Sequence, residues 1–275
     1  MPRRSLLAGS LAAAGTVVAV ALVAGDHLAR GRSAASQPVQ PAASEHREGV
    51  VPRNILRVPL CSPGSIVRLD GPRVAYAVTV RRKAVAYRAP GKHPFARFGR
   101  LNINGVPTVF AVLGARLDRS CRASWYHVQL AMRPNGRTGW VRAGAVTERA
   151  LHVRIVVDLS QRRVTLYRGL KPILVTTAAI GSPSTPTPTG HYYVNQKLVA
   201  PDPLGPFGPA AIGISAFSPV LQHWTQGGPI AIHGTNEAEL LGSAVSHGCI
   251  RVPNDVVVRL WKLVPPGTPV LIRSA

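Results

Sequence analysis

Most of the chain after residue 53 consists of short runs of β-branched and aromatic residues that end at Gly, Pro or Asn. Between residues 54 and 149 these runs are VAYAVTV (74–80), AVAY (84–87), TVFAVL (108–113) and WYHVQL (125–130). Runs of this length and composition, bounded by turn residues, are typical of β-strands. The chain is therefore predicted to fold mostly as β-sheet.

One turn inside this first region is specific. Asn135-Gly136 lies between YHVQL and GWV, and an Asn-Gly pair between two strand-like runs predicts a β-hairpin. Short strands that close with Trp-Tyr, a hairpin and Gly-Trp-Val resemble a small bacterial SH3-like barrel. We therefore expect residues 54–149 to form an SH3-like β domain; an all-β module of another kind is the alternative.

A second β pattern begins near residue 150. LHVRIVVDL (151–159) places apolar residues at alternate positions, and the turn Ser160-Gln161 leads into RRVTLY, which predicts a strand hairpin. One helix is predicted at 254–264, with Asn254 as its N-cap and Pro265 after its end. Residues 150–275 should thus form a second, mostly β domain with one or two short helices and further strands at 172–181, 191–198, 229–233 and 268–273.

The N-terminal segment predicts export. Arg3 and Arg4 precede a stretch without charge from Ser5 to Gly25, which has the order of a secretory signal. The same stretch is long enough to span a bilayer, so residues 1–25 are either a cleaved signal peptide or a membrane anchor. Residues 26–53 are rich in Ala, Ser, Gln and Pro and read as a flexible linker. We expect the protein in the cell envelope, in the periplasm or cell wall.

The charge balance is strongly basic. Thirty-three Lys and Arg against 11 Asp and Glu give a formal net charge of +22. Such a charge favours a polyanionic partner, and for an exported protein this predicts an anionic wall polymer. Scattered arginines without a basic helix argue against nucleic acid. The alternative is that the arginines reflect genomic base composition alone.

The chain has three cysteines, an odd number for an exported protein. Cys61 and Cys121 belong to the same predicted domain, and a bridge between them would close a loop of about 60 residues, for about 4 kcal/mol of stabilisation. This pairing leaves Cys249 as the free thiol.

Cys249 is a candidate nucleophile, because a lone thiol with histidines in its domain can be activated by a base. His233 ends the apolar run PIAIH and is the favoured base; His247 lies two residues before the cysteine. Gly248 is expected to leave amide hydrogens free to face an oxyanion. Three alternatives remain. Cys249 could be an inert core cysteine, or the histidines could be ordinary polar core residues. His233, His247 and Cys249 could also form a zinc site, although HGC lacks the usual ligand spacing.

Three motifs together carry a closer resemblance: TPTPTG (185–190), IHGT (232–235) and SHGCIRV (246–252). They resemble the catalytic domain of the L,D-transpeptidases, the YkuD domain, which implies a β-sandwich. The resemblance implies Cys249 as nucleophile and His233 as general base. It further implies that the Gly234 carbonyl orients the imidazole, that Arg251 binds a carboxylate, and that the pocket is shaped by Ser246, His247 and Gly248.

The function implied by this resemblance is peptidoglycan cross-linking. The thiolate would attack the carbonyl of the third residue of a donor tetrapeptide stem and release D-alanine, and an acceptor amine would resolve the acyl-enzyme to a 3→3 cross-link. No cofactor and no metal are expected. The alternatives are an L,D-carboxypeptidase with the same two residues, and a non-catalytic wall-binding protein.

Overall fold

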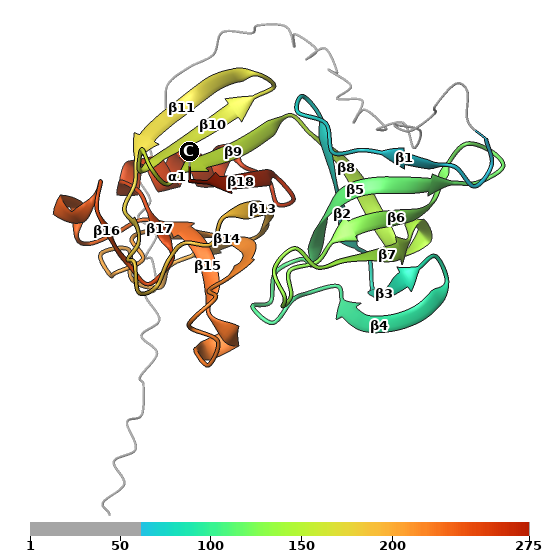
Figure 1. Ribbon diagram of the computed structural model, residues 1–275, viewed down its shortest axis with the longest axis horizontal. Coiled ribbons are helices and arrows are strands. Elements are labelled where there is room, and N and C mark those ends of the chain that lie inside the picture. Colours follow the sequence, from blue (N-terminus) through green and yellow to red (C-terminus); the bar gives the residue numbers. More distant parts are fainter. Residues whose placement is uncertain (1–61, 275) are drawn as a thin grey trace, which may run out of the picture. The chain divides into compact units, whose positions relative to one another are not determined.

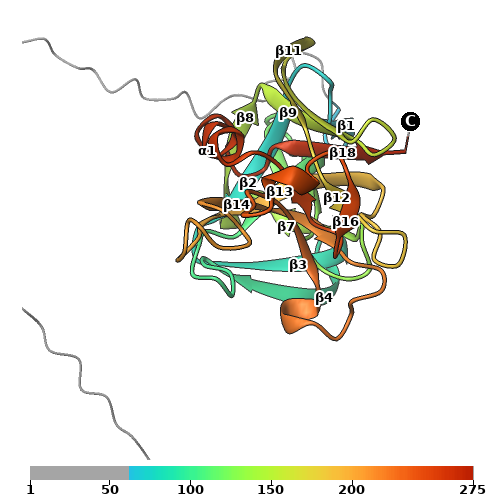
Figure 2. The same ribbon diagram turned by 90° about the vertical axis from the view of Figure 1, so that its left-hand side faces the viewer.

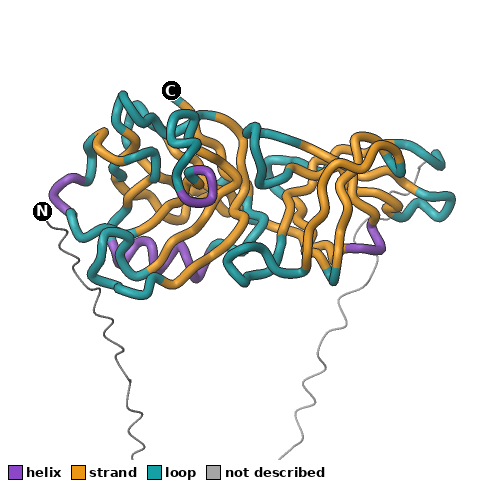
Figure 3. Tube along the Cα trace, turned by 90° about the horizontal axis from the view of Figure 1, so that it is seen from below, coloured by secondary structure: helices purple, strands orange, loops and turns teal. Residues whose placement is uncertain are grey.

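The structure is a computed structural model that describes residues 62–274, all of which belong to one compact unit, Pro52–Ala275. The predicted signal or anchor (1–25), the linker (26–53) and Cys61 lie outside the described residues. Strands predominate, as Figure 3 shows. Within residues 62–274 no helix has the length and apolar character needed to cross a membrane.

The first eight strands form one antiparallel sheet, coloured blue to green in Figure 1. Its order is β4-β3-β7-β6-β5-β2-β8, and β1 pairs with β5. The predicted strands of this region are confirmed, and three further strands (β1, β4 and β8) are added. The bounds are β1 (Ile66–Arg68), β2 (Ala75–Val80), β3 (Lys83–Ala89), β4 (Lys92–Gly99), β5 (Val109–Leu117), β6 (Ala123–Gln129), β7 (Thr138–Arg142) and β8 (Val146–Leu151), with a 3-10 turn η1 (Ala143–Ala145) before β8.

The predicted hairpin is present. β6 and β7 pair antiparallel from Trp125 opposite Arg142 to Gln129 opposite Thr138, and the connection between them contains Asn135. Gly136 has φ +78°, a left-handed conformation that glycine adopts without cost. The assignment of this sheet to the SH3-like class stays a prediction.

The remaining strands form a second sheet of order β11-β10-β9-β18-β13-β14-β15-β17 and a short parallel pair, β12 with β16. The long strand β13 pairs with β18 up to Tyr193 and with β14 from Val194, so it links two groups of strands around one core. The bounds are β9 (Val153–Asp158), β10 (Arg163–Arg168), β11 (Lys171–Thr177), β12 (Ile180–Gly181), β13 (Gly190–Val199), β14 (Ala210–Phe217), β15 (Pro229–His233), β16 (Ala244–Ser246), β17 (Ile250–Arg251) and β18 (Pro269–Arg273), with 3-10 turns η2 (Thr225–Gly227) and η3 (Ala238–Leu240).

The prediction of one strand over 151–159 was wrong. Leu151 ends β8 and pairs with Ala75 in the first sheet, whereas β9 begins at Val153 in the second. The alternation of apolar residues continues through this point because the side chains are buried in two different sheets. His152 therefore marks the change from one sheet to the other, while the hairpin of β9 and β10 is confirmed.

The predicted helix is confirmed as α1 (Asn254–Leu263), which buries Val256, Val257 and Leu260 and packs against β14 and β15 (Figure 2). The predicted role of Asn254 as its cap was wrong. Pro253 holds the N-cap position and no side chain caps the helix. The Asn254 side chain points elsewhere, to the segment that follows β15.

Candidate active site

The two residues of the predicted catalytic pair come together at one edge of the second sheet. β15 ends at His233, and the parallel strand β17 beside it pairs Arg251 with His233 and Ile250 with Ile232. Cys249 directly precedes β17. Cys249 therefore lies two residues before the partner of His233, an offset of about 7 Å along the strand at about 3.3 Å per residue.

The His233 imidazole is held in one tautomer. Its Nδ1 lies 2.6 Å from the Gly234 carbonyl oxygen, which can only accept a hydrogen bond, so Nδ1 carries the proton and Nε2 carries the lone pair. His233 is buried, with 3% of its surface exposed, and its ring meets the edge of Phe207 with 5.1 Å between ring centroids. Burial, with a smaller contribution from the Arg251 cation, lowers the pKa of His233 to about 4. The imidazole is therefore neutral at pH 7.

Cys249 carries a free and partly buried thiol. Burial raises the pKa of this thiol, while the backbone of Ala231 and the Arg251 cation act in the opposite direction. The net shift is upward, so the resting form is the neutral thiol. A neutral thiol beside a neutral imidazole is the arrangement of a nucleophile that a general base must deprotonate during attack.

The turn before Cys249 is fixed by the buried Ser246. Its hydroxyl donates to the Cys249 carbonyl at 2.6 Å and accepts from the Gly248 amide at 3.1 Å. The expectation that the Gly248 amide is free to face an oxyanion was therefore wrong: the Ser246 hydroxyl occupies it. Gly248 has φ +109°, which requires glycine, and a Cβ there would lie 3.0 Å from Ile230 Cδ1.

Two threonines of the segment 185–190 hold the same turn from the other side. Thr185 Oγ1 donates to the Ser246 carbonyl and Thr187 Oγ1 donates to the Gly248 carbonyl, both at 2.9 Å. The Gly181 amide in turn donates to Thr187 Oγ1 at 2.8 Å. The sequence pointed to TPTPTG only through the resemblance; the hydrogen bonds show what its threonines do.

Arg251 forms an ion pair with Glu237, a partner that the sequence did not indicate. The side chain of Arg251 is mostly buried, whereas that of Glu237 is half exposed. The guanidinium expected to bind a substrate carboxylate thus already holds one from its own chain. Its positive charge also reaches both members of the pair, because it lowers the pKa of His233 and opposes the rise of the Cys249 pKa.

Asn254 fixes the backbone after His233. Its Oδ1 accepts from the Thr235 amide at 2.8 Å, and it lies so close to Gly234 that a Cβ on Gly234 would be 2.2 Å away. Gly208 approaches the same point, where an added Cβ would lie 2.7 Å from the Gly234 Cα. The glycine whose carbonyl orients the imidazole is thus held between two chain segments, and only glycine fits there.

His247 lies on the surface, with its ring 5.3 Å from that of Trp224. In the part of the chain that the structure describes, no group of three or more His, Cys, Asp or Glu side chains could hold a metal ion. Among residues 62–274, His233, His247 and Cys249 are thus not brought together as a group of metal ligands.

Comparison with known proteins shows what the second sheet is similar to. Residues 152–272 match the family model YkuD, the L,D-transpeptidase catalytic domain. "Putative L,D-transpeptidase YkuD" of Bacillus licheniformis is 37% identical over 119 residues, which cover 43% of this chain and 64% of the relative. The Bacillus subtilis protein of the same name is 36% identical over 119 residues, 43% of this chain and 65% of the relative.

The matched segment therefore spans just under two thirds of these relatives. Among solved structures, the catalytic domain from an E. faecium L,D-transpeptidase, determined by NMR, is 30% identical. The match covers 44% of this chain and 96% of that chain, with a TM-score of 0.33.

Proposed function

We propose that this protein is a peptidoglycan L,D-transpeptidase with Cys249 as its nucleophile and His233 as its general base. The observation that carries the proposal is the fixed His233 tautomer: Nδ1 bonds the Gly234 carbonyl, which leaves Nε2 as a base at the sheet edge where Cys249 lies. The YkuD match over residues 152–272 supports the reaction class.

In the first half of the reaction, His233 Nε2 takes the Cys249 proton while the sulfur attacks the carbonyl of the third residue of a donor tetrapeptide stem. The bond to D-alanine then breaks, and the imidazolium returns its proton to the leaving amine. The product is a thioester between Cys249 and the donor. A thiol with a raised pKa needs this concerted transfer, because little thiolate exists beforehand.

In the second half, an amine of an acceptor stem attacks the thioester and His233 removes a proton from it. The carbon–sulfur bond then breaks, and the imidazolium returns its proton to the leaving sulfur. The products are the 3→3 cross-link and the free thiol. Ser246, Gly248 and Gly234 act by position, since they hold the Cys249 turn and the His233 ring. Arg251 keeps a positive charge near the pair.

The test is incubation of the purified protein with tetrapeptide muropeptides, followed by mass spectrometry. We expect cross-linked dimers and free D-alanine, and neither product from the Cys249→Ala variant. Tripeptide without dimers would identify the L,D-carboxypeptidase instead. If Cys249→Ala still forms dimers, another group is the nucleophile, and no turnover with intact binding to the wall would support a non-catalytic wall-binding protein.

We further propose that the protein is exported, with residues 1–25 as signal peptide or anchor. N-terminal sequencing of the exported protein separates the two, because cleavage exposes a new N-terminus and an anchor keeps Met1.

We propose a disulfide bridge between Cys61 and Cys121. Peptide mapping under non-reducing conditions tests it, and two free thiols would exclude it.

We also propose that the first sheet, as an SH3-like domain, and the basic surface help the protein to bind the wall and its anionic polymers. Residues 54–149 alone would then bind sacculi. Binding of the whole protein should weaken as salt rises. Salt-independent binding would exclude the electrostatic part of this proposal.

A further inference from the structure

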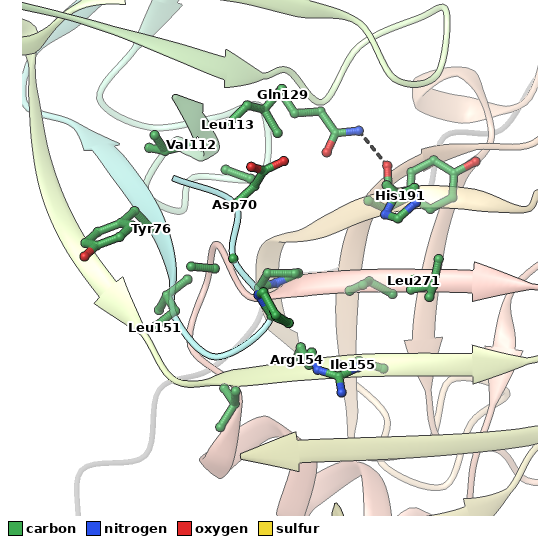
Figure 4. A pocket seen from close by; sticks show the side chains of 18 of the residues that line it. Asp70, Tyr76, Val112, Leu113, Gln129, Leu151, Arg154, Ile155, His191 and Leu271 are labelled. Carbon is green, nitrogen blue, oxygen red and sulfur yellow. Dashed lines mark hydrogen bonds between the residues drawn. The ribbon is translucent and has the colours of Figure 1, made fainter. Parts of the chain in front are cut away.

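A cavity of about 600 Å³ lies where strands of the first sheet meet strands of the second (Figure 4). Its walls come from β1, the β1–β2 connection, β2, β5 and β6 on one side, and from β9, β13 and β18 on the other. Gln129 Nε2 donates to the His191 carbonyl at 2.7 Å across this meeting point. Gly267 also packs tightly there, because an added Cβ would lie 2.1 Å from Ala77 Cβ. The cavity walls are therefore fixed by packing and by a hydrogen bond.

This cavity is separate from the proposed active site. In the second sheet it uses β9, β18 and β13, whereas His233 and Cys249 lie on β15 and beside β17, beyond β14. Three strand spacings separate β13 from β17, about 14 Å at roughly 4.8 Å per strand. None of the residues that line the cavity belongs to the His233 and Cys249 constellation.

The lining combines an apolar floor with charged groups. The floor is formed by Val112, Leu113, Leu151, Ile155 and Leu271, and the charged and titratable groups are two unpaired arginines, an ion pair and two histidines. Cavities of 300–1,000 Å³ with an apolar lining and a few polar groups are typical of small-ligand sites. The size and lining therefore fit a short ligand with aliphatic parts and charged groups.

The arginines are free to bind an anionic group. Among residues 62–274, the ion pairs are Arg68–Asp70, Arg251–Glu237 and Arg273–Asp158, so neither Arg73 nor Arg154 has a carboxylate partner there. Arg154 stacks on the Tyr167 ring at 4.2 Å, and its buried Nε has no hydrogen-bond partner. The Arg154 guanidinium is thus held by the Tyr167 ring and not by a carboxylate of residues 62–274.

The cavity also holds one acidic group, Asp70. The Asp70 carboxylate pairs with Arg68 at 2.8 Å, and Arg68 is 86% exposed, so a solvent-exposed pair of this kind is weak and can exchange its partner. Figure 4 shows Asp70, Gln129, Arg154 and His191 around the same space. A ligand with both a carboxylate and an ammonium group can pair with Arg73 or Arg154 and with Asp70. Its aliphatic parts can also contact the apolar floor, which a chain of phosphates cannot do.

We propose that this cavity binds a short zwitterionic peptide with free carboxylates, of the stem-peptide class, at a second site apart from Cys249. The charges and the apolar floor of the cavity indicate the chemical class of the ligand. Its assignment to stem peptides rests on the proposed function. Such a site would hold a strand of substrate on the enzyme while another stem reacts. By their charges, Arg73 and Arg154 would bind the carboxylate and Asp70 the ammonium group.

The probe is the tripeptide L-Ala-γ-D-Glu-diaminopimelate, which lacks the D-alanine leaving group and therefore cannot acylate Cys249. Its binding to the full chain, with the thiol blocked by a β-lactam, is measured by calorimetry. We expect Arg73→Gln and Arg154→Gln each to raise Kd at least tenfold. Arg168→Gln, an exposed arginine on β10 outside the cavity, is the matched control and should bind as the unchanged protein does.

Acylation of Cys249 by the β-lactam separates this proposal from the proposed function, because the cavity variants should acylate at the unchanged rate. Unchanged tripeptide binding in both variants would overturn the proposal, as would tighter binding of a glycerol-phosphate oligomer than of the tripeptide. If Arg154→Gln fails to fold, Arg73→Gln decides, since Arg73 is exposed in a connection outside the strands. If the β-lactam fails to acylate Cys249, tripeptide binding is measured on the unblocked protein; a loss of binding in the two cavity variants would then contradict the proposed function and leave the second site standing.

Discussion

Burial of His233 makes the stability of the protein depend on pH in a defined window. The folded protein lowers the pKa of His233 from 6.5 to about 4, chiefly because burial disfavours the charged imidazolium. The unfolded chain keeps the ordinary value near 6.5. Between these two values the unfolded chain binds a proton that the folded protein does not, so stability falls as the pH falls.

The size of this effect follows from the same values. One unit of pKa difference between the folded and unfolded states corresponds to about 1.4 kcal/mol. The lowering of the His233 pKa from 6.5 to about 4 therefore corresponds to about 3 kcal/mol of unfolding free energy. This contribution is fully present above pH 6.5 and is lost by about pH 4. Below that pH both states carry the proton, and this loss stops.

The assay compares the full chain with His233→Gln, which cannot titrate, by denaturant unfolding at several pH values from 7 to 4. Carboxylates titrate in both proteins and cancel in the difference. We expect the unchanged protein to lose about 3 kcal/mol more than the variant over this range. Equal losses, or a larger loss in the variant, would show that the imidazole is not buried as a neutral base. An NMR titration of the His233 ring gives the pKa directly and should place it near 4.

Other substitutions test the parts that position the pair. Ser246→Ala removes two hydrogen bonds of the Cys249 turn and should cost about 1–3 kcal/mol of stability and slow acylation, whereas unchanged acylation would show that the turn holds without it. Gly248→Ala places a side chain at φ +109° and should cost about 1–3 kcal/mol, measured by denaturant unfolding; a neutral effect would contradict the strain. Arg251→Gln removes a cation that lowers the pKa of His233, so NMR titration should show a higher pKa, with the exposed Arg259→Gln as control; no change would mean that burial alone sets the value.

Local patterns predicted the strands well where each lies within one sheet. The hairpin at Asn135-Gly136, the β9–β10 hairpin and α1 follow from turn residues and periodicity that act over a few residues. The division at His152 was not predictable in this way, because alternation records that a side chain is buried but not in which sheet. β14 was missed because its central position buries both faces, which leaves AAIGISAF without alternation.

The prediction of the candidate site was limited in the same way, because local patterns do not reveal contacts between distant segments. Cys249 and His233 were found because a thiol and a histidine carry chemistry by type, and parallel pairing of β15 with β17 brings them to one edge. The contacts of Glu237, Thr187 and Asn254 were missed, since each joins segments that are distant in sequence. The Gly248 amide was predicted to be free for the same reason. The sequence does not show that the Ser246 hydroxyl accepts a hydrogen bond from it.

The central claim is that the Cys249 thiol is the group that becomes acylated. The most direct measurement is the intact mass of the protein after incubation with a carbapenem, followed by peptide mapping of the adduct. We predict one adduct per chain, located on the peptide that contains Cys249, and no adduct on Cys249→Ala, whose melting temperature stays close to that of the unchanged protein. An adduct of the same mass on Cys249→Ala, or a mapped position elsewhere in the chain, would contradict the account.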